Sequence, residues 1–139
     1  MKDQFIAFVV ARPGRIRDGL IALLRAIPEI GTIEPLGDDI SVLARISHHP
    51  QTLVLLDASL MNQDIWSAIK QVKSRQPPPR CKCLVLADNS FQQRMAIAAG
   101  ADEVLLTGFP AYEFFATVEN LLNQSPASQG QAKEAARLN

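Results

Sequence analysis

Apolar residues in this chain form two kinds of pattern, short dense runs and longer stretches with helical spacing. The dense runs are typical of strands and occupy residues 5–10, 32–36, 53–56, 81–87 and 104–106. Helical spacing is found between and after them, in residues 16–27, 40–46, 63–75, 90–99 and 112–122. Five strands alternating with five helices predict an α/β fold, a doubly wound five-stranded parallel sheet with helices on both faces.

Prolines, glycines and small polar residues mark the ends of these elements. Pro28 and Gly31 stop the first helix, and one of residues 88–90 caps the fourth helix, which ends before Gly100. Pro35 interrupts the second run, and proline is tolerated best in a strand at the edge of a sheet. With the second strand at an edge and the third in the centre, we expect the flavodoxin-like strand order 2-1-3-4-5.

Composition bounds the size and the class of the protein. With 139 residues and 47% hydrophobic content, we expect one domain over residues 1–124 and a flexible tail or linker over 125–139. Fourteen basic and fourteen acidic residues give a net charge of zero, so global charge does not favour direct binding of nucleic acid or of an anionic membrane. No apolar stretch approaches about 18 residues, which predicts a soluble, cytoplasmic protein without a membrane partner.

One carboxylate, Asp57, directly follows the apolar run at residues 53–56. In an open parallel sheet, the carboxyl ends of the strands meet at one edge, and ligands bind there. The residues after the other strands at this edge are Ala11, Arg12, Ala87 and Thr107. Asp57 is therefore the candidate for chemistry; the structural alternative is a strand-end aspartate that only caps a turn.

The two cysteines, Cys81 and Cys83, are separated by one residue and point to the same side of the fourth strand. That spacing does not suit a structural zinc site, and no histidine is nearby in the sequence. We therefore expect both thiols to pack in the core rather than to bind metal or carry out redox chemistry.

Three segments, in order and at the right spacing, resemble the receiver domains of two-component response regulators. They are VARPGRIRDGLIALL from Val10, LLDASLMNQD around Asp57, and GADEVLLTGF from Gly100. The resemblance covers Phe5 to about Leu122. It implies the CheY-like form of the fold and places Asp57 at the position of the phospho-accepting aspartate.

The same resemblance exposes departures at the other functional positions. Ala11 and Arg12 stand where receivers carry the two acidic residues that hold Mg²⁺. The phosphoryl-contacting lysine falls on Thr107, the hydroxyl residue on Ala87 and the switching aromatic on Val104. Because Mg²⁺ requires oxygen ligands and phosphoryl transfer depends on cations, we expect weak or absent Mg²⁺ binding, no other cofactor and no enzymatic activity.

Arg12 is the one nearby candidate cation at this edge. We expect its guanidinium to pair with the Asp57 carboxylate, because a guanidinium fits a carboxylate in a bidentate geometry and the two residues follow neighbouring strands. Such a pair would keep Asp57 ionised and engaged.

These residues predict an atypical, pseudo-receiver domain that signals through protein–protein contacts. One alternative is a receiver that a histidine kinase still phosphorylates on Asp57. Another is a small-molecule or anion-binding module, in which Arg12, Arg15 and Arg17 would attract a phosphate although the first loop has few backbone donors.

The resemblance also suggests partners. They are a histidine kinase, an output domain, or a second copy of the chain that docks through the face of the fourth helix, fifth strand and fifth helix. The apolar residues in that region are Phe91, Met95, Tyr112 and Phe115. The sequence alone does not show which of these four residues are exposed, and core packing is the default expectation for each.

Overall fold

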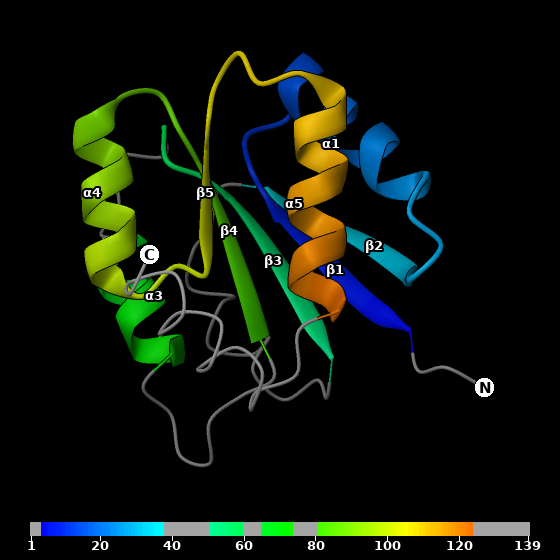
Figure 1. Ribbon diagram of the computed structural model, residues 1–139, viewed down its shortest axis with the longest axis horizontal. Coiled ribbons are helices and arrows are strands. Elements are labelled where there is room, and N and C mark those ends of the chain that lie inside the picture. Colours follow the sequence, from blue (N-terminus) through cyan, green and yellow to red (C-terminus); the bar gives the residue numbers. More distant parts are fainter. Residues whose placement is uncertain (1–3, 38–50, 60–64, 74–80, 124–139) are drawn as a thin grey trace, which may run out of the picture.

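The computed structural model of the chain describes residues 4–37, 51–59, 65–73 and 81–123. Strands and helices alternate along these residues, except that the second and third strands follow each other with no described helix between them (Figure 1). The elements are β1 (Phe5–Val10), α1 (Arg15–Arg25), β2 (Ile30–Gly37), β3 (Thr52–Asp57), α3 (Ile65–Lys73), β4 (Cys81–Ala87), α4 (Ser90–Ala99), β5 (Glu103–Leu106) and α5 (Ala111–Asn123).

All five strands form one parallel sheet with the order β2-β1-β3-β4-β5, which confirms the predicted fold and strand order. β1 pairs with β2 on one side and with β3 on the other. Pro35 lies in the edge strand β2, as expected, and a register shift follows where Val9 pairs with Pro35 but Val10 pairs with Gly37. An edge strand tolerates this proline because one side of its backbone has no neighbour in the sheet.

Helices cover both faces of the sheet. Figure 1 shows α1 and α5 on one face and α3 and α4 on the other. Because successive side chains of a strand point to opposite faces, each central strand supplies both layers of the core. Residues 53 and 55 of β3 pack toward α1 and α5, whereas residues 54 and 56 pack toward α3 and α4.

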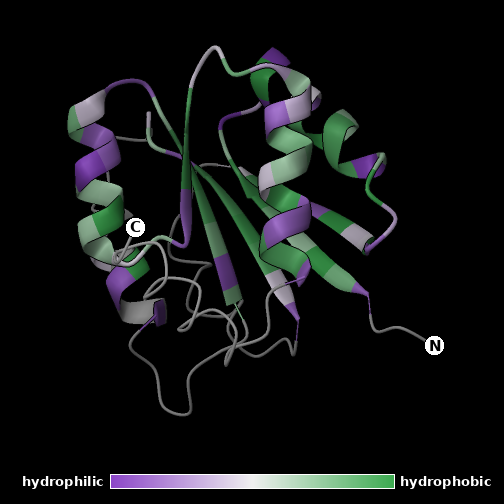
Figure 2. Ribbon diagram, in the orientation of Figure 1, coloured by the Kyte–Doolittle hydropathy of each residue, from purple (hydrophilic) through white to green (hydrophobic). Residues whose placement is uncertain are grey.

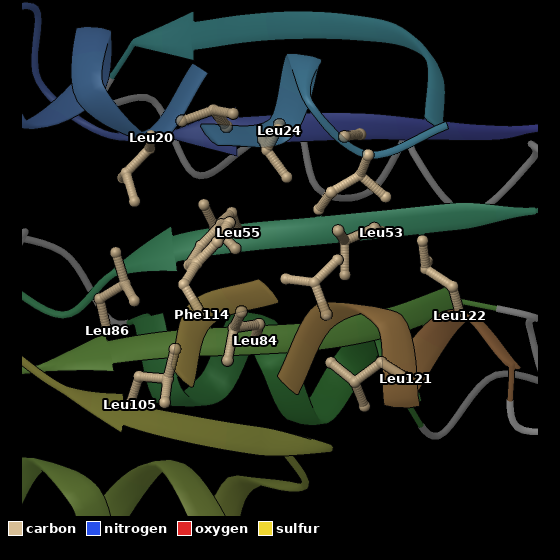
Figure 3. Packing of buried hydrophobic residues seen from close by; sticks show 14 of the residues in the cluster. Leu20, Leu24, Leu53, Leu55, Leu84, Leu86, Leu105, Phe114, Leu121 and Leu122 are labelled. Atoms are coloured by element: carbon tan, nitrogen blue, oxygen red, sulfur yellow. The ribbon is translucent and has the colours of Figure 1, made fainter. Parts of the chain in front are cut away.

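Two of the three interior strands, β3 and β4, are hydrophobic on both faces, as their sequence predicts. Every residue of β4 is buried, and so are the first five residues of β3. Figure 2 shows the central strands as mainly hydrophobic and the helices as mixed. The core on the α1 and α5 side is shown in Figure 3, where the labelled side chains include Leu24, Leu55, Leu84, Phe114 and Leu121.

Element boundaries agree closely with the sequence patterns. β4 coincides with the expected strand, β5 begins one residue earlier at Glu103, and β2 extends beyond the expected 32–36. The helix expected over 40–46, the ends of the helix expected over 63–75 and the tail at 125–139 lie outside the described residues.

α4 has a defined cap at each end. The Asn89 side chain accepts a hydrogen bond from the backbone N–H of Gln92 at 2.9 Å, as a helix N-cap does. Gly100 follows the helix with φ of +107°, a left-handed conformation that favours glycine. Both caps lie where the sequence signals placed them.

The amino edge of the sheet, where the parallel strands begin, contains an ion pair. Lys73 Nζ at the end of α3 donates to Asp102 Oδ2 at 2.8 Å and to the Cys81 carbonyl at 2.9 Å. The same Asp102 oxygen accepts the backbone N–H of Cys83 at 2.7 Å. We call these four residues the amino-edge clamp; it joins α3, β4 and the start of β5.

Both cysteines are buried and free, as the sequence predicted. Burial raises the pKa of the Cys81 thiol to about 11 and raises that of Cys83 further, so both thiols are protonated at neutral pH. Among the described helices, none has the length and the apolar character that a membrane crossing requires.

Candidate functional site

The carboxyl edge of the sheet brings the expected positions together. Val10 pairs with Leu56, so the next residues of the two strands, Ala11 and Asp57, lie side by side. At the other side of β3, Asp57 pairs with Leu86 of β4. The backbone N–H of Thr107 donates to the Ala87 carbonyl at 2.8 Å, which extends the pairing of β4 and β5 by one step.

Asp57 is half-buried at the end of β3. Its Oδ1 accepts a hydrogen bond from the backbone N–H of Ser59 at 2.9 Å. This contact, from an aspartate to the backbone two residues later, stabilises the turn that leaves the strand. The structural role considered for Asp57 from the sequence is therefore present, whatever further chemistry the carboxylate performs.

The expected ion pair between Arg12 and Asp57 was wrong. Within the described part of the chain, these two side chains form no salt bridge, and Arg12 is exposed to solvent. Water competes for an exposed guanidinium, and an exposed ion pair contributes little stability against the loss of side-chain freedom. The ends of β1 and β3 are adjacent at the backbone level, but the Arg12 guanidinium and the Asp57 carboxylate do not pair.

The side chains around Asp57 are poor ligands for a hard cation. Ala11, which lies beside Asp57, is 1% exposed and offers only a methyl group. Arg12 carries a positive charge. Among the described residues, no cluster of three or more histidine, cysteine, aspartate or glutamate side chains is arranged to hold a metal ion. Mg²⁺ prefers several oxygen ligands, so this donor set does not fit it.

The remaining expected positions add no charge that would contact a phosphoryl group. Ala87 is completely buried at the end of β4, and Val104 packs partly buried against the core on the α3 and α4 side. Thr107 is exposed after β5. Among these expected positions, Asp57 is the one carboxylate, and its neighbours Ala11 and Ala87 offer only methyl groups.

Sequence reasoning missed the side chain that organises the loop between β4 and α4. Gln92 is 4% exposed, and its Oε1 accepts the backbone N–H of Asp88 at 2.7 Å. Together with the Asn89 cap, this contact resembles a capping box, in which a side chain at the third helical position reaches back to the preceding backbone. The spacing Asn89-x-x-Gln92 was the available signal.

Core packing, the default expectation for the four apolar residues of this region, was wrong for two of them. Phe91 and Tyr112 are exposed, by 57% and 76%, whereas Met95 and Phe115 are half-buried. Two further apolar side chains in the described part of this region are exposed, Ile97 by 59% and Leu106 by 43%. Ile97 belongs to α4 and Leu106 to β5, and these two elements pack against each other.

Comparison with known proteins gives weak sequence matches. No protein-family model matches the chain. Two curated relatives are protein-glutamate methylesterase/protein-glutamine glutaminase 2 of Pseudomonas syringae and protein-glutamate methylesterase/protein-glutamine glutaminase 1 of Pseudomonas savastanoi. Each is 25% identical over 91 residues, which make up 65% of this chain and 25% of the relative. The chain thus spans about a quarter of the length of these relatives.

Solved structures give a stronger likeness. A response regulator receiver domain from Bermanella marisrubri has a TM-score of 0.72 at 17% identity and covers 88% of this chain and 100% of its own. The receiver domain of a Pseudomonas aeruginosa sensor histidine kinase, solved with magnesium coordinated in its active-site cleft, has a TM-score of 0.69 at 20% identity, with the same coverage. At these identities the likeness shows the fold, which is that of CheY-like receiver domains.

Proposed function

We propose that this chain, which has the receiver-domain fold, is a pseudo-receiver of a two-component-type signalling protein. It acts by binding other proteins and does not depend on Mg²⁺-assisted phosphorylation of Asp57. The observation that carries this proposal is Ala11, a buried methyl group beside Asp57 where a metal-binding carboxylate would be required.

The charge balance of the site supports the same conclusion. Phosphoryl transfer is catalysed mainly by positioning and by cations that neutralise charge on the transferring group. Thr107 supplies a hydroxyl group and not an ammonium, and Arg12 makes no ion pair with the acceptor among the described residues. The site keeps a nucleophilic carboxylate, Asp57, but lacks the neighbouring cations that would activate a phosphodonor.

The test is modification of the full chain. The protein is incubated with acetyl phosphate, or with beryllofluoride, in the presence and absence of Mg²⁺, and is followed by intact mass and amide NMR. We expect no adduct and no Mg²⁺-dependent shift near Asp57. The Pseudomonas aeruginosa receiver domain, whose structure holds magnesium, serves as the positive control.

Two variants make the result specific. Asp57→Ala removes the acceptor, and Asp88→Ala removes an exposed carboxylate that follows the neighbouring strand. A stoichiometric adduct that is lost in Asp57→Ala and kept in Asp88→Ala would overturn the proposal. It would establish instead a receiver whose Asp57 accepts a phosphoryl group, as the kinase-phosphorylated alternative requires.

The proposed binding surface is the face formed by α4, β5 and α5. It exposes Ile97 and Leu106 from two elements in contact, and exposed apolar side chains of this size favour association. Its occupant is a kinase, an output domain or a second copy of the chain. For the second copy, analytical ultracentrifugation over a concentration series should show a dimer that Ile97→Glu weakens and that Ile16→Glu, on the exposed side of α1, leaves unchanged.

A further inference from the structure

We infer that helix α4 is fixed at both ends by side-chain contacts that do not involve Asp57. The order of its two ends is therefore independent of the chemical state of that carboxylate. This inference concerns the mechanics of the helix and stands whether or not Asp57 is ever modified.

The N-terminal end of α4 is held by two side-chain hydrogen bonds. The Asn89 side chain accepts from the Gln92 backbone at 2.9 Å, and the Gln92 side chain accepts from the Asp88 backbone at 2.7 Å. Since Gln92 is 4% exposed, water has little access to replace these contacts. The loop from β4 into α4 is thus closed by its own side chains.

The C-terminal end is held by the amino-edge clamp. The Gly100 and Ala101 backbone N–H groups donate to the Ile97 and Ala96 carbonyls, which closes the last turn of the helix. Asp102, one residue further, is anchored by Lys73 and by the Cys83 backbone. The stem of Lys73 also lies close to Gly100, since a Cβ built on that glycine would be 3.5 Å from Lys73 Cγ.

Asp57 has no direct side-chain connection to either end. Its Oδ1 accepts the Ser59 backbone N–H. The contact from its turn to β4 is made by backbone, from the Ala58 N–H to the Leu86 carbonyl at 2.9 Å. Ala87, the next residue of β4, contributes only a methyl group and cannot hydrogen-bond to a modified carboxylate. Within the described residues, no side-chain hydrogen bond or ion pair joins Asp57 to the loop between β4 and α4.

A fixed helix has a consequence for recognition. The two exposed apolar residues of α4 lie near its two ends: Phe91 follows Asn89 by two residues, and Ile97 lies one turn before Gly100. The contacts that hold each end of the helix therefore also position these side chains. Their arrangement would be the same whether or not Asp57 is modified. A partner that binds these residues of α4 would then bind with the same affinity whatever the chemical state of Asp57.

Hydrogen exchange of the full chain tests this inference. Amide exchange is measured for wild type, Gln92→Ala, Lys73→Met and Asp57→Asn. The matched controls are Gln93→Ala, at the next and half-buried position of α4, and Lys70→Met, at an exposed lysine of α3. Asn89→Ser, which keeps a capping oxygen, accompanies Asn89→Ala in case Gln92→Ala does not fold.

We expect Gln92→Ala and Asn89→Ala to accelerate exchange at the Asp88 and Gln92 amides by about tenfold, because a lost cap opens the first turn. Lys73→Met should accelerate exchange at Cys83, while Asn89→Ser, the controls and Asp57→Asn should stay within about twofold of wild type at these amides. The inference is overturned if Asp57→Asn accelerates exchange in α4 as much as Gln92→Ala does, or if removing Asn89 and Gln92 leaves exchange unchanged.

Discussion

Lys73 and Asp102 form a 2.8 Å ion pair although they lie 29 positions apart in the sequence. The Asp102 side chain is 4% exposed, and the Lys73 side chain is 25% exposed. A buried carboxylate needs both a counter-charge and hydrogen bonds to replace its lost hydration. Lys73 supplies the charge to Asp102, and the Cys83 backbone N–H supplies a hydrogen bond. The aspartate of the Gly-Ala-Asp segment before β5 therefore has a structural role, holding α3, β4 and β5 together, and takes no part in chemistry at Asp57.

Asp102→Ala should be strongly destabilising. The substitution leaves the Cys83 N–H and the Lys73 ammonium without their shared acceptor, which we expect to lower the free energy of unfolding by about 2–4 kcal/mol. Urea denaturation followed by circular dichroism measures the change. Asp88→Ala, at an exposed position, should remain within about 0.5 kcal/mol of wild type. Equal effects of the two substitutions would argue against the clamp.

The buried thiols should make stability fall at alkaline pH. Burial raises the pKa of Cys81 from 9.0 to about 11 in the folded protein, and burial raises that of Cys83 as well. In the unfolded chain the thiols lose their protons near their ordinary value, so between pH 9.0 and about 11 the folded state binds more protons than the unfolded state. The free energy of unfolding should then decrease by up to about 1.4 kcal/mol per pH unit for each thiol.

Denaturation curves at several pH values check this slope. The double variant Cys81→Ala/Cys83→Ala should have a flatter profile over the same window, and a profile as steep as that of wild type would assign the slope to other groups. In native wild type at pH 8, a thiol reagent should label neither cysteine until denaturant is added, because the thiolate is the reactive form.

Two glycines should respond in opposite directions to the same substitution. Gly100→Ala places a side chain at a φ of +107°, and we expect a loss of about 1–2 kcal/mol from the strained left-handed conformation. Gly19 lies inside α1, where an added Cβ would meet nothing within 4 Å. Gly19→Ala should therefore gain about 0.5–1 kcal/mol through better helix propensity. Thermal denaturation of both variants gives the comparison, and changes of the same sign would contradict it.

Restoring carboxylates at the first loop should create a metal response that wild type lacks. In Ala11→Asp/Arg12→Asp, the acidic side chain at the buried position 11 should cost about 1–3 kcal/mol of stability without metal. Mg²⁺ should recover part of this loss by binding the folded state, and so raise the Tm of the variant. The Tm of wild type should not change with Mg²⁺; a rise equal to that of the variant would show that the natural residues already bind the ion.

The sequence was sufficient for the fold because local and global signals agree. The apolar run from Cys81 to Ala87 matches a strand buried along its whole length. Asn89 and Gly100 mark the ends of α4 through capping chemistry that depends only on neighbouring residues. Pro35 placed its strand at the edge because an interior position would have lost a ladder hydrogen bond.

The site was harder to predict because its contacts depend on side-chain direction. Strand order placed Arg12 near Asp57 at the backbone level, but it did not reveal that Arg12 extends into solvent. Lys73 and Asp102 meet only after three elements have packed, and no local spacing indicates such a pair. Gln92 gave a local signal, whereas its burial follows from the packing of α4 on the sheet.

The irregular edge strand β2 has a consequence for how copies of the protein meet. A regular, open strand invites another chain to add alongside it, which is a route to fibrous aggregates. In β2 the backbone donor is missing at Pro35, the register slips beside it, and the preceding Glu34 is an exposed charge. An incoming strand would find an interrupted ladder and a charge to desolvate, so the feature that kept this strand at the margin of the sheet also protects the protein from edge-to-edge polymerisation.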